Sequence, residues 1–355
     1  MQKTFIIAEA GVNHNGSLDI AKKLIKAAKK AKADAIKFQY FNVENLVKKN
    51  AEKAPYQKKN DIKKNTQYQM LKKYEFGIDK FKVLKNFSKK LNIDFILSPF
   101  DLSALYQMKK FLNPKIIKIA SGEITNFQLL SELNIDKEKI ILSTGMSNIK
   151  EIVDACNIIA KKKFLEFKNK KIIIRNQKIF NKIKKKLTIL HCVSSYPASD
   201  QFLNLNAITM MKKNLRLNIG FSDHSEDIFA SIIAVSKGAK IIEKHITLNR
   251  NMKGPDHKAS VEPKVFLKMV KSIKRTNKIL GNPIKKIQNS EIQNLKPARK
   301  SIYAKKNILK NEKFTKENLI VQRPFVGICA SKYFELIGTK SKKVYKPGQI
   351  IKLVR

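Results

Sequence analysis

The stretch Ile116-Ile-Lys-Ile-Ala-Ser-Gly122 shows the pattern that decides the fold of this chain. A short apolar run, typical of a buried strand, is followed at once by a serine and a glycine. Other apolar runs also lead into polar or charged residues, and together they give eight strand candidates. Besides 116–119, the runs are Phe5–Ala8, Ala35–Phe38, Phe95–Leu97, Ile140–Leu142, Leu187–Leu190, Ile219–Phe221 and Ile241–Lys244.

Amphipathic helical patterns lie between these runs. Ser17 can cap a helix whose apolar residues recur from Leu18 to Ala28, and a second pattern runs from Phe81 to Leu91. Strands that alternate with helices eight times predict a parallel (β/α)8 TIM barrel, which we assign to residues 1–281. In such a barrel the C-terminal strand ends share one mouth, where the active site lies. The sequence contains neither a G-x-G-x-x-G motif nor a P-loop.

The remaining segments are expected to have other roles. The polar stretch from Phe41 to Tyr74 is too long for a simple connection and is interpreted as a lid. The Lys- and Asn-rich insertion from Phe164 to Lys186 is interpreted as a surface excursion. Residues 282–300 are predicted to be a linker, and residues 301–355 a small second domain with short β-like pieces.

The composition excludes some functions. The formal net charge of +46 suggests a nucleic-acid partner, but 67 of the 74 basic residues are Lys and are spread along the chain. Because reading bases and clamping phosphates favour Arg, we expect no nucleic-acid partner. No apolar run is long enough for a membrane span or a secretory signal, so the expected location is the cytoplasm, without a membrane partner. The three cysteines fit neither a disulfide framework nor a thiolate metal site.

Two histidines are candidate metal ligands. His224 and His245 follow neighbouring strand candidates and would project into one barrel mouth. Two imidazoles with carboxylate, water or substrate oxygens suit Mn²⁺ or Mg²⁺ better than a closed zinc site. The alternative is a pair of hydrogen-bonded core histidines. Glu243 alternates with His245 on the same strand, and Glu123 is expected in the mouth.

Two lysines point to an anionic substrate. Lys37 and Lys118 lie inside apolar strand candidates, where a buried ammonium needs a negative partner. Hydroxyl and backbone N–H groups at Ser121-Gly122 and Ser143-Thr-Gly145 are of the kind that binds phosphate. The lysines could instead pair with the carboxylates of the mouth, Glu9, Glu123 and Glu243. A barrel-strand lysine could also be a Schiff-base nucleophile, as in an aldolase.

Taken in order, these motifs resemble those of the bacterial sialic acid synthase family, which includes N-acetylneuraminate, N,N'-diacetyllegionaminate and pseudaminate synthases. The motifs are Glu9-Ala-Gly-Val-Asn-His-Asn-Gly16, Lys37-Phe-Gln39, Ser98-Pro-Phe100, Lys118-Ile-Ala-Ser-Gly-Glu-Ile-Thr-Asn126, Ser143-Thr-Gly-Met146, His191-Cys192 with Tyr196-Pro197, Gly220-Phe-Ser-Asp-His224, Glu243-Lys-His245 and Gly254-Pro-Asp-His-Lys-Ala-Ser260. The resemblance continues through Ala298-Arg-Lys-Ser-Ile302 and Arg323-Pro324, where the small domain looks like the family's antifreeze-like (SAF) module.

The resemblance implies a transferase that condenses phosphoenolpyruvate with an open-chain N-acetylmannosamine-type sugar and releases phosphate. It implies Mn²⁺, or alternatively Mg²⁺ or Co²⁺, on His224 and His245, and a domain-swapped homodimer. Glu123, Lys118 and Asp256 would be the catalytic residues, with Glu123 as the general base. Phosphoenolpyruvate would be bound by Lys37, Lys118, Ser121, Ser143, Ser194 and Ser222. The sugar would be bound by Glu9, Gln39, Tyr196, Asp256 and Arg323.

Some positions depart from the family's pattern. Ser194 stands where some of these synthases have Asn, and Phe325-Val326 follows Arg323-Pro324 in place of the usual Gly-x-Gly. Ile124-Thr-Asn126 and Lys53-Ala-Pro-Tyr-Gln57 look closer to legionaminate and enterobacterial sialate synthases than to pseudaminate synthases. We therefore expect N-acetylneuraminate as the product, with N,N'-diacetyllegionaminate as the alternative and a Schiff-base sialate aldolase as a more remote one.

Overall fold

The computed structural model describes residues 3–60 and 65–352 and divides into two compact units, Met1–Gly281 and Asn282–Arg355. Each unit is described by itself. Residues 61–64 of the predicted lid and residues 353–355 of the predicted second domain lie outside the described residues.

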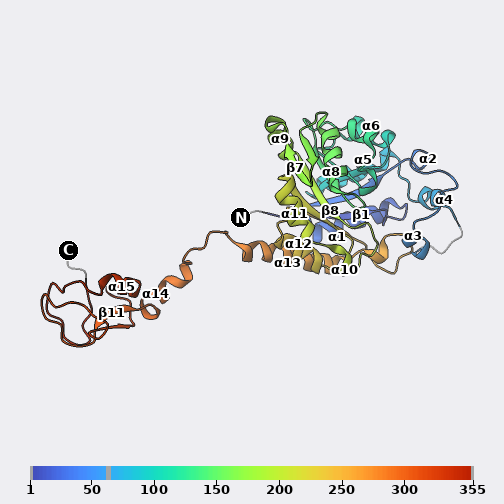
Figure 1. Ribbon diagram of the computed structural model, residues 1–355. Helices are drawn as coiled ribbons and strands as arrows, with labels where there is room; N and C mark the ends of the chain where they lie inside the picture. The colour runs from blue at the N-terminus through green and yellow to red at the C-terminus, as the bar shows by residue number, and fades with distance from the viewer. Residues whose placement is uncertain (1–2, 61–64, 353–355) are drawn as a thin grey trace. The chain divides into compact units, whose positions relative to one another are not determined.

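The first unit is a closed barrel of parallel strands, which confirms the predicted (β/α)8 fold (Figure 1). Its order is β1-β10-β9-β8-β5-β4-β3-β2, so each strand is hydrogen-bonded to two neighbours. All eight strand candidates form the barrel. The strands are β1 (Phe5–Gly11), β2 (Ala35–Tyr40), β3 (Asp94–Pro99), β4 (Ile116–Ile119), β5 (Lys139–Ser143), β8 (Leu187–Cys192), β9 (Asn218–Asp223) and β10 (Ile241–His245).

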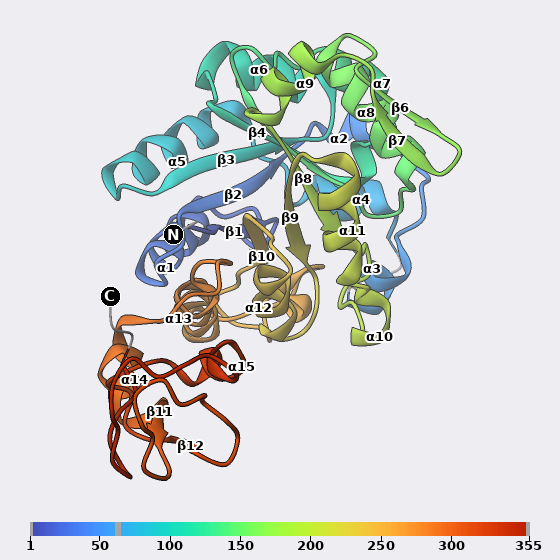
Figure 2. The same ribbon diagram turned by 60° about the vertical axis from the view of Figure 1, so that its left-hand side comes forward.

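Amphipathic helices cover the outside of the barrel, as the turned view in Figure 2 shows for α1, α5, α6, α12 and α13. The Ser17 side chain accepts a hydrogen bond from the backbone N–H of Ile20 and caps α1 as predicted. The longer helices are α1 (Leu18–Lys30), α5 (Ile78–Lys90), α6 (Leu102–Leu112), α8 (Ile149–Ala160), α11 (Asn206–Leu215), α12 (Phe229–Ser236) and α13 (Pro263–Leu280). Shorter pieces are α2 (Val43–Leu46), α3 (Pro55–Asn60), α4 (Gln67–Lys72), α7 (Phe127–Ser131), α10 (Asp200–Leu203), η1 (Ser121–Glu123) and η2 (His257–Ala259).

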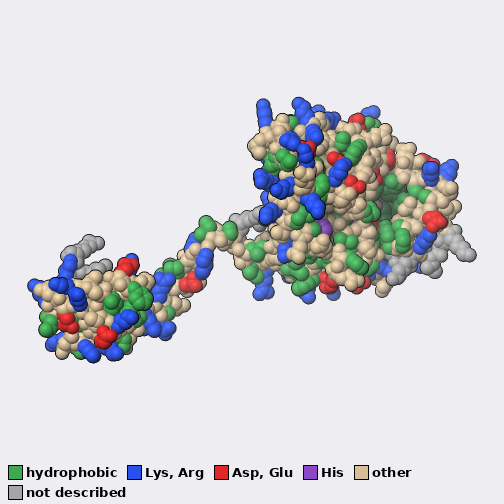
Figure 3. Space-filling model, in the orientation of Figure 1, with side chains coloured by type: hydrophobic (Ala, Val, Ile, Leu, Met, Phe, Trp, Pro, Cys, Tyr) green, Lys and Arg blue, Asp and Glu red, His purple; other side chains and the backbone are tan. Residues whose placement is uncertain are grey.

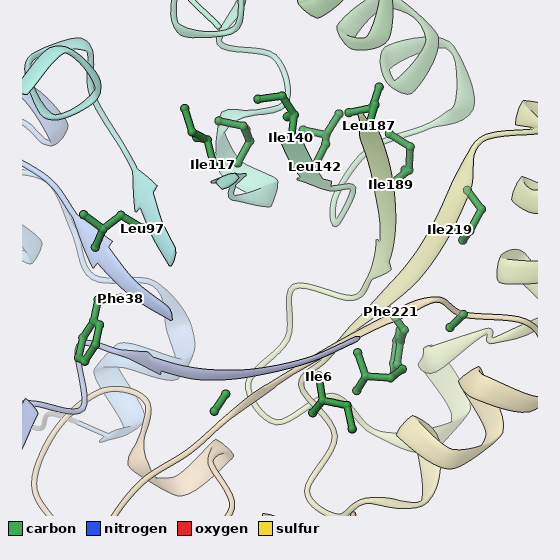
Figure 4. Packing of buried hydrophobic residues seen from close by; sticks show 14 of the residues in the cluster. Ile6, Phe38, Leu97, Ile117, Ile140, Leu142, Leu187, Ile189, Ile219 and Phe221 are labelled. Atoms are coloured by element: carbon green, nitrogen blue, oxygen red, sulfur yellow. The ribbon is translucent and has the colours of Figure 1, made fainter. Parts of the chain in front are cut away.

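Alternation along the strands separates two apolar layers. Side chains such as Ile6, Leu97 and Ile189 pack between the strands and the helices (Figure 4). A separate small cluster, made of Ile7, Ala35, Ile96, Ile141 and Leu190, fills the inside of the barrel. Side chains two residues apart on a strand face the same side of the sheet, so the next inward-facing positions lie two residues further along. Most of these positions are polar. The inside of the barrel therefore has an apolar floor below a polar mouth.

The insertion predicted as a surface excursion has more structure than expected. Strands β6 (Leu165–Lys168) and β7 (Lys171–Ile174) form an antiparallel hairpin, and α9 (Gln177–Lys184) follows it. Phe164 and Phe180 are buried, and the Asn157 side chain of α8 binds the backbone of residues 164 and 165. The scattered apolar residues of this insertion thus extend the barrel's outer core.

The second unit has its own small core. Strands β11 (Ser301–Ala304) and β12 (Leu319–Gln322) pair antiparallel, and η4 (Ala330–Lys332) and α15 (Tyr333–Leu336) follow. Ile302, Phe314, Leu319 and Tyr345 belong to its buried cluster. The stretch predicted as a linker contains two helical pieces, η3 (Asn289–Glu291) and α14 (Ile292–Ala298), because a capping box at Gln288 and Glu291 starts a helical turn there.

Basic side chains are scattered over the face shown in Figure 3 and do not gather over one element. Cys156 and Cys192 are buried, Cys329 is half-buried, and none of them forms a disulfide. Within the described residues, no helix has both the length and the apolar character needed to cross a membrane.

Candidate active site

A cavity of about 540 Å³ opens at the C-terminal ends of the barrel strands. Its walls contain all the site residues predicted in the first unit: Glu9, Lys37, Gln39, Lys118, Ser121, Glu123, Ser143, Ser194, Tyr196, Ser222, His224, His245 and Asp256. The strands carry most of them, and η1 carries Ser121 and Glu123. Arg323 is the exception, because it belongs to the second unit, directly after β12.

A layer of buried charges lies just above the apolar floor, and we call Glu9, Lys37, Lys118 and Glu243 the mouth network. Lys37 Nζ is 2.9 Å from Glu9 Oε1 and 3.7 Å from Glu243 Oε2. Lys118 Nζ is 3.3 Å from Glu243 Oε1, which also accepts a hydrogen bond from Ser222. The lysines therefore do pair with mouth carboxylates. Glu123 is not among their partners, since its carboxylate accepts a bond from Asn126.

The pKa values in this network move in opposite directions. Burial raises the pKa of Glu9 to about 7, because the pull of Lys37 does not outweigh the loss of solvent and the repulsion from Glu243. Burial also opposes the charged form of Glu243, but Lys118 and Lys37 outweigh it and lower that pKa to about 2. For Lys118, burial outweighs the carboxylates and lowers the pKa, whereas for Lys37 the two carboxylates win and raise it.

The mouth network is not fully hydrogen-bonded within the protein. Glu9 Oε2, Glu243 Oε2, Ser143 Oγ and His245 Nδ1 are buried atoms without a hydrogen-bond partner. Buried polar atoms are nearly always paired, and exceptions often belong to sites that bind a ligand or water. These four atoms come from β1, β5 and β10, on residues that line the cavity. Other buried atoms of the described residues that lack a partner lie outside its lining: Asn13 Oδ1, His14 Nε2, Asn65 Nδ2 and Ser88 Oγ.

Small residues form one wall of the cavity. The backbone N–H of Gly145 donates to Ser121 Oγ, at 3.0 Å. A Cβ atom at Gly145 would lie 2.2 Å from Ser194 Oγ and 2.9 Å from Ser121 Oγ, so a larger residue there would force these hydroxyls to move. Ser143 precedes this turn and its hydroxyl has no partner. The wall offers hydroxyl donors within the field of two buried ammonium groups, as a phosphate-bearing ligand requires.

The two predicted metal ligands lie side by side. The ring centres of His224 and His245 are 5.6 Å apart. His224 Nδ1 is 2.8 Å from the carbonyl oxygen of Val193, which can only accept, so Nδ1 carries a proton and Nε2 is the nitrogen left to bind a metal. Burial holds the pKa of His245 well below its usual value, so this imidazole is neutral, the form that binds metals.

These residues fit an open metal site. The pKa of His224 is raised, because Cys192 and the Val193 carbonyl outweigh its burial, so a metal there would displace a proton. Across residues 3–60 and 65–352, no cluster of three or more His, Cys, Asp and Glu side chains could hold a metal. A metal held by His224 and His245 would have two imidazole ligands and would take water or substrate oxygens at its other coordination positions, which suits Mn²⁺ or Mg²⁺ better than structural zinc.

An aromatic column, made of Tyr196 and Tyr56, packs on His224 in the wall of the cavity. Tyr196 lies over His224, with ring centres 4.1 Å apart, and Tyr56 of α3 packs on Tyr196 at 4.8 Å. Gln57, Gln67 and Leu71 from the same connection also line the cavity. The described part of the predicted lid, residues 41–60 and 65–74, therefore contributes directly to the site. The sequence pointed to the segment and to the resemblance of Lys53-Ala-Pro-Tyr-Gln57 to related synthases, but it assigned no site role to Tyr56 or Gln57.

Asp256 and Glu123 are the remaining acids of the cavity. Burial raises the pKa of Asp256 to about 6 and that of Glu123 above its usual value. A Cβ at Gly11, whose φ is +50°, would approach Glu9, Asp256 and His245 within 3.2–3.4 Å, so these three groups converge around a glycine. Burial thus favours the protonated form of both carboxyls, and with a pKa of about 6 Asp256 can exchange a proton near neutral pH, as a general acid–base group must.

The other three histidines do not line the cavity. His14 stacks on Phe76 and accepts from the N–H of Gly16, and His191 Nε2 bonds the carbonyl of Leu203. His257 lies between Thr247 and Asn15 and holds the loop that carries Asp256. All five histidines follow strand candidates, but only His224 and His245 face the cavity. A position near a strand end therefore does not by itself predict a site residue.

Comparisons with known proteins agree with this geometry. The NeuB family profile matches residues 24–285, and the SAF domain profile matches residues 299–355. The chain is 43% identical to a Campylobacter jejuni N,N'-diacetyllegionaminic acid synthase over 99% of this chain and 100% of that protein. It is 30% identical to the human N-acetylneuraminate-9-phosphate synthase over 95% and 88%. A solved N-acetylneuraminic acid synthetase from Leptospira borgpetersenii superposes with a TM-score of 0.69, at 38% identity over 82% and 90% of the two chains.

Proposed function

The chain belongs to the NeuB family and ends in a SAF domain, and from this premise we propose that it is a nonulosonic acid synthase. The proposed reaction condenses phosphoenolpyruvate with an open-chain 2-acetamido sugar, releases phosphate and forms a nine-carbon 2-keto acid. The observation that carries the proposal is the barrel mouth, where two buried lysines, unsatisfied polar atoms and two adjacent histidines surround one cavity. The same barrel matches relatives named for this class of synthase over nearly the whole chain.

Lys37 and Lys118 would bind the phosphate and carboxylate of phosphoenolpyruvate, with Ser121, Ser143, Ser194 and Ser222 as hydroxyl donors. In the free protein the ammonium group of Lys37 forms an ion pair with Glu9, and that of Lys118 forms one with Glu243. An incoming trianion would compete for them, and the raised pKa of Glu9 lets this carboxyl take up a proton when the anion binds. We assign Lys118 a role as a charge partner rather than a Schiff-base nucleophile, because Glu243 is beside its ammonium.

His224 and His245 would hold the divalent cation, with Mn²⁺ preferred and Mg²⁺ or Co²⁺ as alternatives. A cation bound there supplies Lewis-acid polarisation of the sugar aldehyde. Tyr196 covers His224 and would limit water on that side. Glu123 is the candidate general base for the water that adds to C2. Asp256, which lies close to Glu9 and His245 around Gly11, would bind the sugar hydroxyls together with Glu9 and Gln39.

The sequence alone led us to expect N-acetylneuraminate as the product, with N,N'-diacetyllegionaminate as the alternative. We now favour N,N'-diacetyllegionaminate. One wall of the cavity is apolar: Val12, Phe41, Leu46, Val47, Leu71 and Phe100 line it. Such a wall suits a 6-deoxy sugar with a second acetamido methyl better than a sugar with free hydroxyls at C4 and C6. Two curated relatives, at 43% and 38% identity, carry the legionaminic acid name.

The remaining expectations are part of the same proposal. We place the protein in the cytoplasm as a domain-swapped homodimer in which Arg323 binds the acetamido group of the sugar in the partner's barrel. A guanidinium suits this role because its planar fork gives several donors at once.

Phosphate release from phosphoenolpyruvate tests the function. We expect faster release with 2,4-diacetamido-2,4,6-trideoxymannose than with N-acetylmannosamine, and loss of release after EDTA that Mn²⁺ restores. Equal use of pyruvate, with a borohydride-trapped adduct on Lys118, would instead identify a Schiff-base aldolase. Preference for N-acetylmannosamine would keep the reaction class and return the product to N-acetylneuraminate.

A further inference from the structure

A second buried ion pair lies behind the two histidines. Lys244 Nζ is 3.1 Å from Asp223 Oδ2, and both side chains are 0% exposed. The two residues are directly opposite each other on β9 and β10, and each comes one residue before a candidate metal ligand. Because successive side chains of a strand face opposite sides, Lys244 points away from the cavity that Glu243 and His245 face.

The pair is the centre of a closed set of hydrogen bonds, which we call the outer network: Asp223, Ser225, Ser231 and Lys244. Asp223 Oδ1 accepts from the N–H and the hydroxyl of Ser225, at 2.8 and 2.6 Å. Asp223 Oδ2 accepts from Ser231 of α12 at 2.5 Å, and Lys244 Nζ donates to the carbonyl of Ser225 at 2.9 Å. The network thus ties the backbone just after His224 to the strand that ends in His245.

Stability alone gives a weak reason for this arrangement. The cost of removing two charges from water often cancels their attraction, so a buried pair can be no more stabilising than apolar residues of the same size. What apolar residues cannot supply is a fixed backbone position, because they offer no directional bonds to the Ser225 carbonyl and N–H. His224 is also held at its ring, through Nδ1 and the Val193 carbonyl. Ring and backbone restraints together leave His224 little freedom relative to His245.

We propose that the Asp223–Lys244 pair is a positioning element of the metal site. It fixes the ends of β9 and β10 so that His224 and His245 present their imidazoles to one divalent cation without reorganisation. Asp223 and Lys244 touch neither substrate nor metal, and they act through the two histidines. The inference rests on the proposed function, which assigns the metal to these histidines.

Mn²⁺ binding to the metal-free full-length protein, measured by calorimetry, tests the inference. We expect Lys244→Met, and the double variant Asp223→Asn/Lys244→Met, to bind Mn²⁺ about 10-fold more weakly, the lower end of the range seen when groups supporting a ligand are lost. Phosphoenolpyruvate affinity of the metal-free protein should stay unchanged. The matched control is Lys240→Met, because Lys240 bonds Asn218 between the opposite ends of the same two strands, and its Mn²⁺ affinity should equal that of the wild type.

The double variant guards against a trivial loss of folding, since it leaves no unpaired buried charge. Wild-type Mn²⁺ affinity in this folded variant would overturn the positioning role while leaving the proposed function intact. An equal loss of Mn²⁺ and phosphoenolpyruvate affinity would also overturn it, because that result means a general loosening of the mouth. A wild-type protein that binds no Mn²⁺ would overturn the metal assignment itself, and the two failures are therefore distinguishable.

Discussion

The mouth network and the outer network are built on the same strands, yet they differ in how completely they are satisfied. Glu243 and Lys244 are neighbours on β10 and point to opposite sides of the barrel wall. In the mouth network Glu9 and Glu243 each keep one buried oxygen without a hydrogen-bond partner. In the outer network, both oxygens of Asp223 have partners from Ser225, Ser231 or Lys244.

This difference indicates that the mouth network is suited to bind a ligand, whereas the outer network supports the strand ends. A fully bonded network in a dry interior is stable as it is, whereas unsatisfied groups beside a cavity cost free energy until a ligand pairs with them. Burial and charge alone would have ranked the two networks equally. The atoms of Glu9 and Glu243 that lack a hydrogen-bond partner lie on the cavity side of the wall, where we propose that the substrates bind.

The largest effect is expected at the histidines above the mouth network. His224→Ala or His245→Ala should abolish Mn²⁺ binding and turnover and leave the fold intact, because each imidazole projects into the cavity. Calorimetry with Mn²⁺ and circular dichroism would check this. His191→Gln is the control, since His191 also ends a strand but bonds the Leu203 carbonyl. Near-normal turnover of either alanine variant at saturating Mn²⁺ would contradict the assignment of the metal to these histidines.

Lys118→Met should separate the two networks. Loss of a hydrogen bond to a charged ligand costs about 1.5–3 kcal/mol, so the KM for phosphoenolpyruvate should rise roughly 10- to 100-fold. Mn²⁺ affinity should not change, which is the reverse of the pattern expected for Lys244→Met. Steady-state phosphate release and Mn²⁺ calorimetry on both variants provide the comparison. A pyruvate adduct on Lys118 in reduced wild-type protein would contradict the role as a charge partner.

Glu9→Gln tests the electrostatics of the mouth network through stability. Folding raises the pKa of Glu9 from its usual 4.5 to about 7, so the folded state holds its proton more tightly. The stability from this group is present below about pH 4.5 and is lost as the pH rises through 7, by up to about 1.4 kcal/mol per pH unit. Glutamine cannot titrate, so the variant should lack this decline. Unfolding by urea at pH 5, 6 and 7 measures it, and parallel profiles for the two proteins would refute it.

The smallest effect is expected at the aromatic column. Tyr56→Ala removes a ring that packs on Tyr196 at 4.8 Å, a contact worth about 0.5–1.5 kcal/mol. We expect the KM for the sugar to rise a few-fold, while the KM for phosphoenolpyruvate stays constant. Tyr56→Phe is the matched control and should behave as the wild type. A change confined to phosphoenolpyruvate would mean that the column covers the other substrate.

Much of the site followed from the sequence because a barrel brings strand ends together. Lys37, Lys118, His224 and His245 come from four different strands or their ends, and the rule that C-terminal ends share one mouth was enough to group them. The apolar runs also fixed the number of strands. Each of these inferences depends only on local pattern and on a constraint that all such barrels share.

The tertiary structure alone decided which polar groups have partners. Glu123 bonds Asn126 and no lysine, and Lys244, one residue from a candidate ligand, lies in a closed network on the far side of the wall. The lid side chain Tyr56 reaches Tyr196 across 140 residues of sequence. Hydrogen bonds and ring contacts of this kind depend on distances of a few ångströms between segments far apart in the chain. Period-2 and period-3.6 patterns record which face a residue occupies, but they carry no information about what lies opposite it.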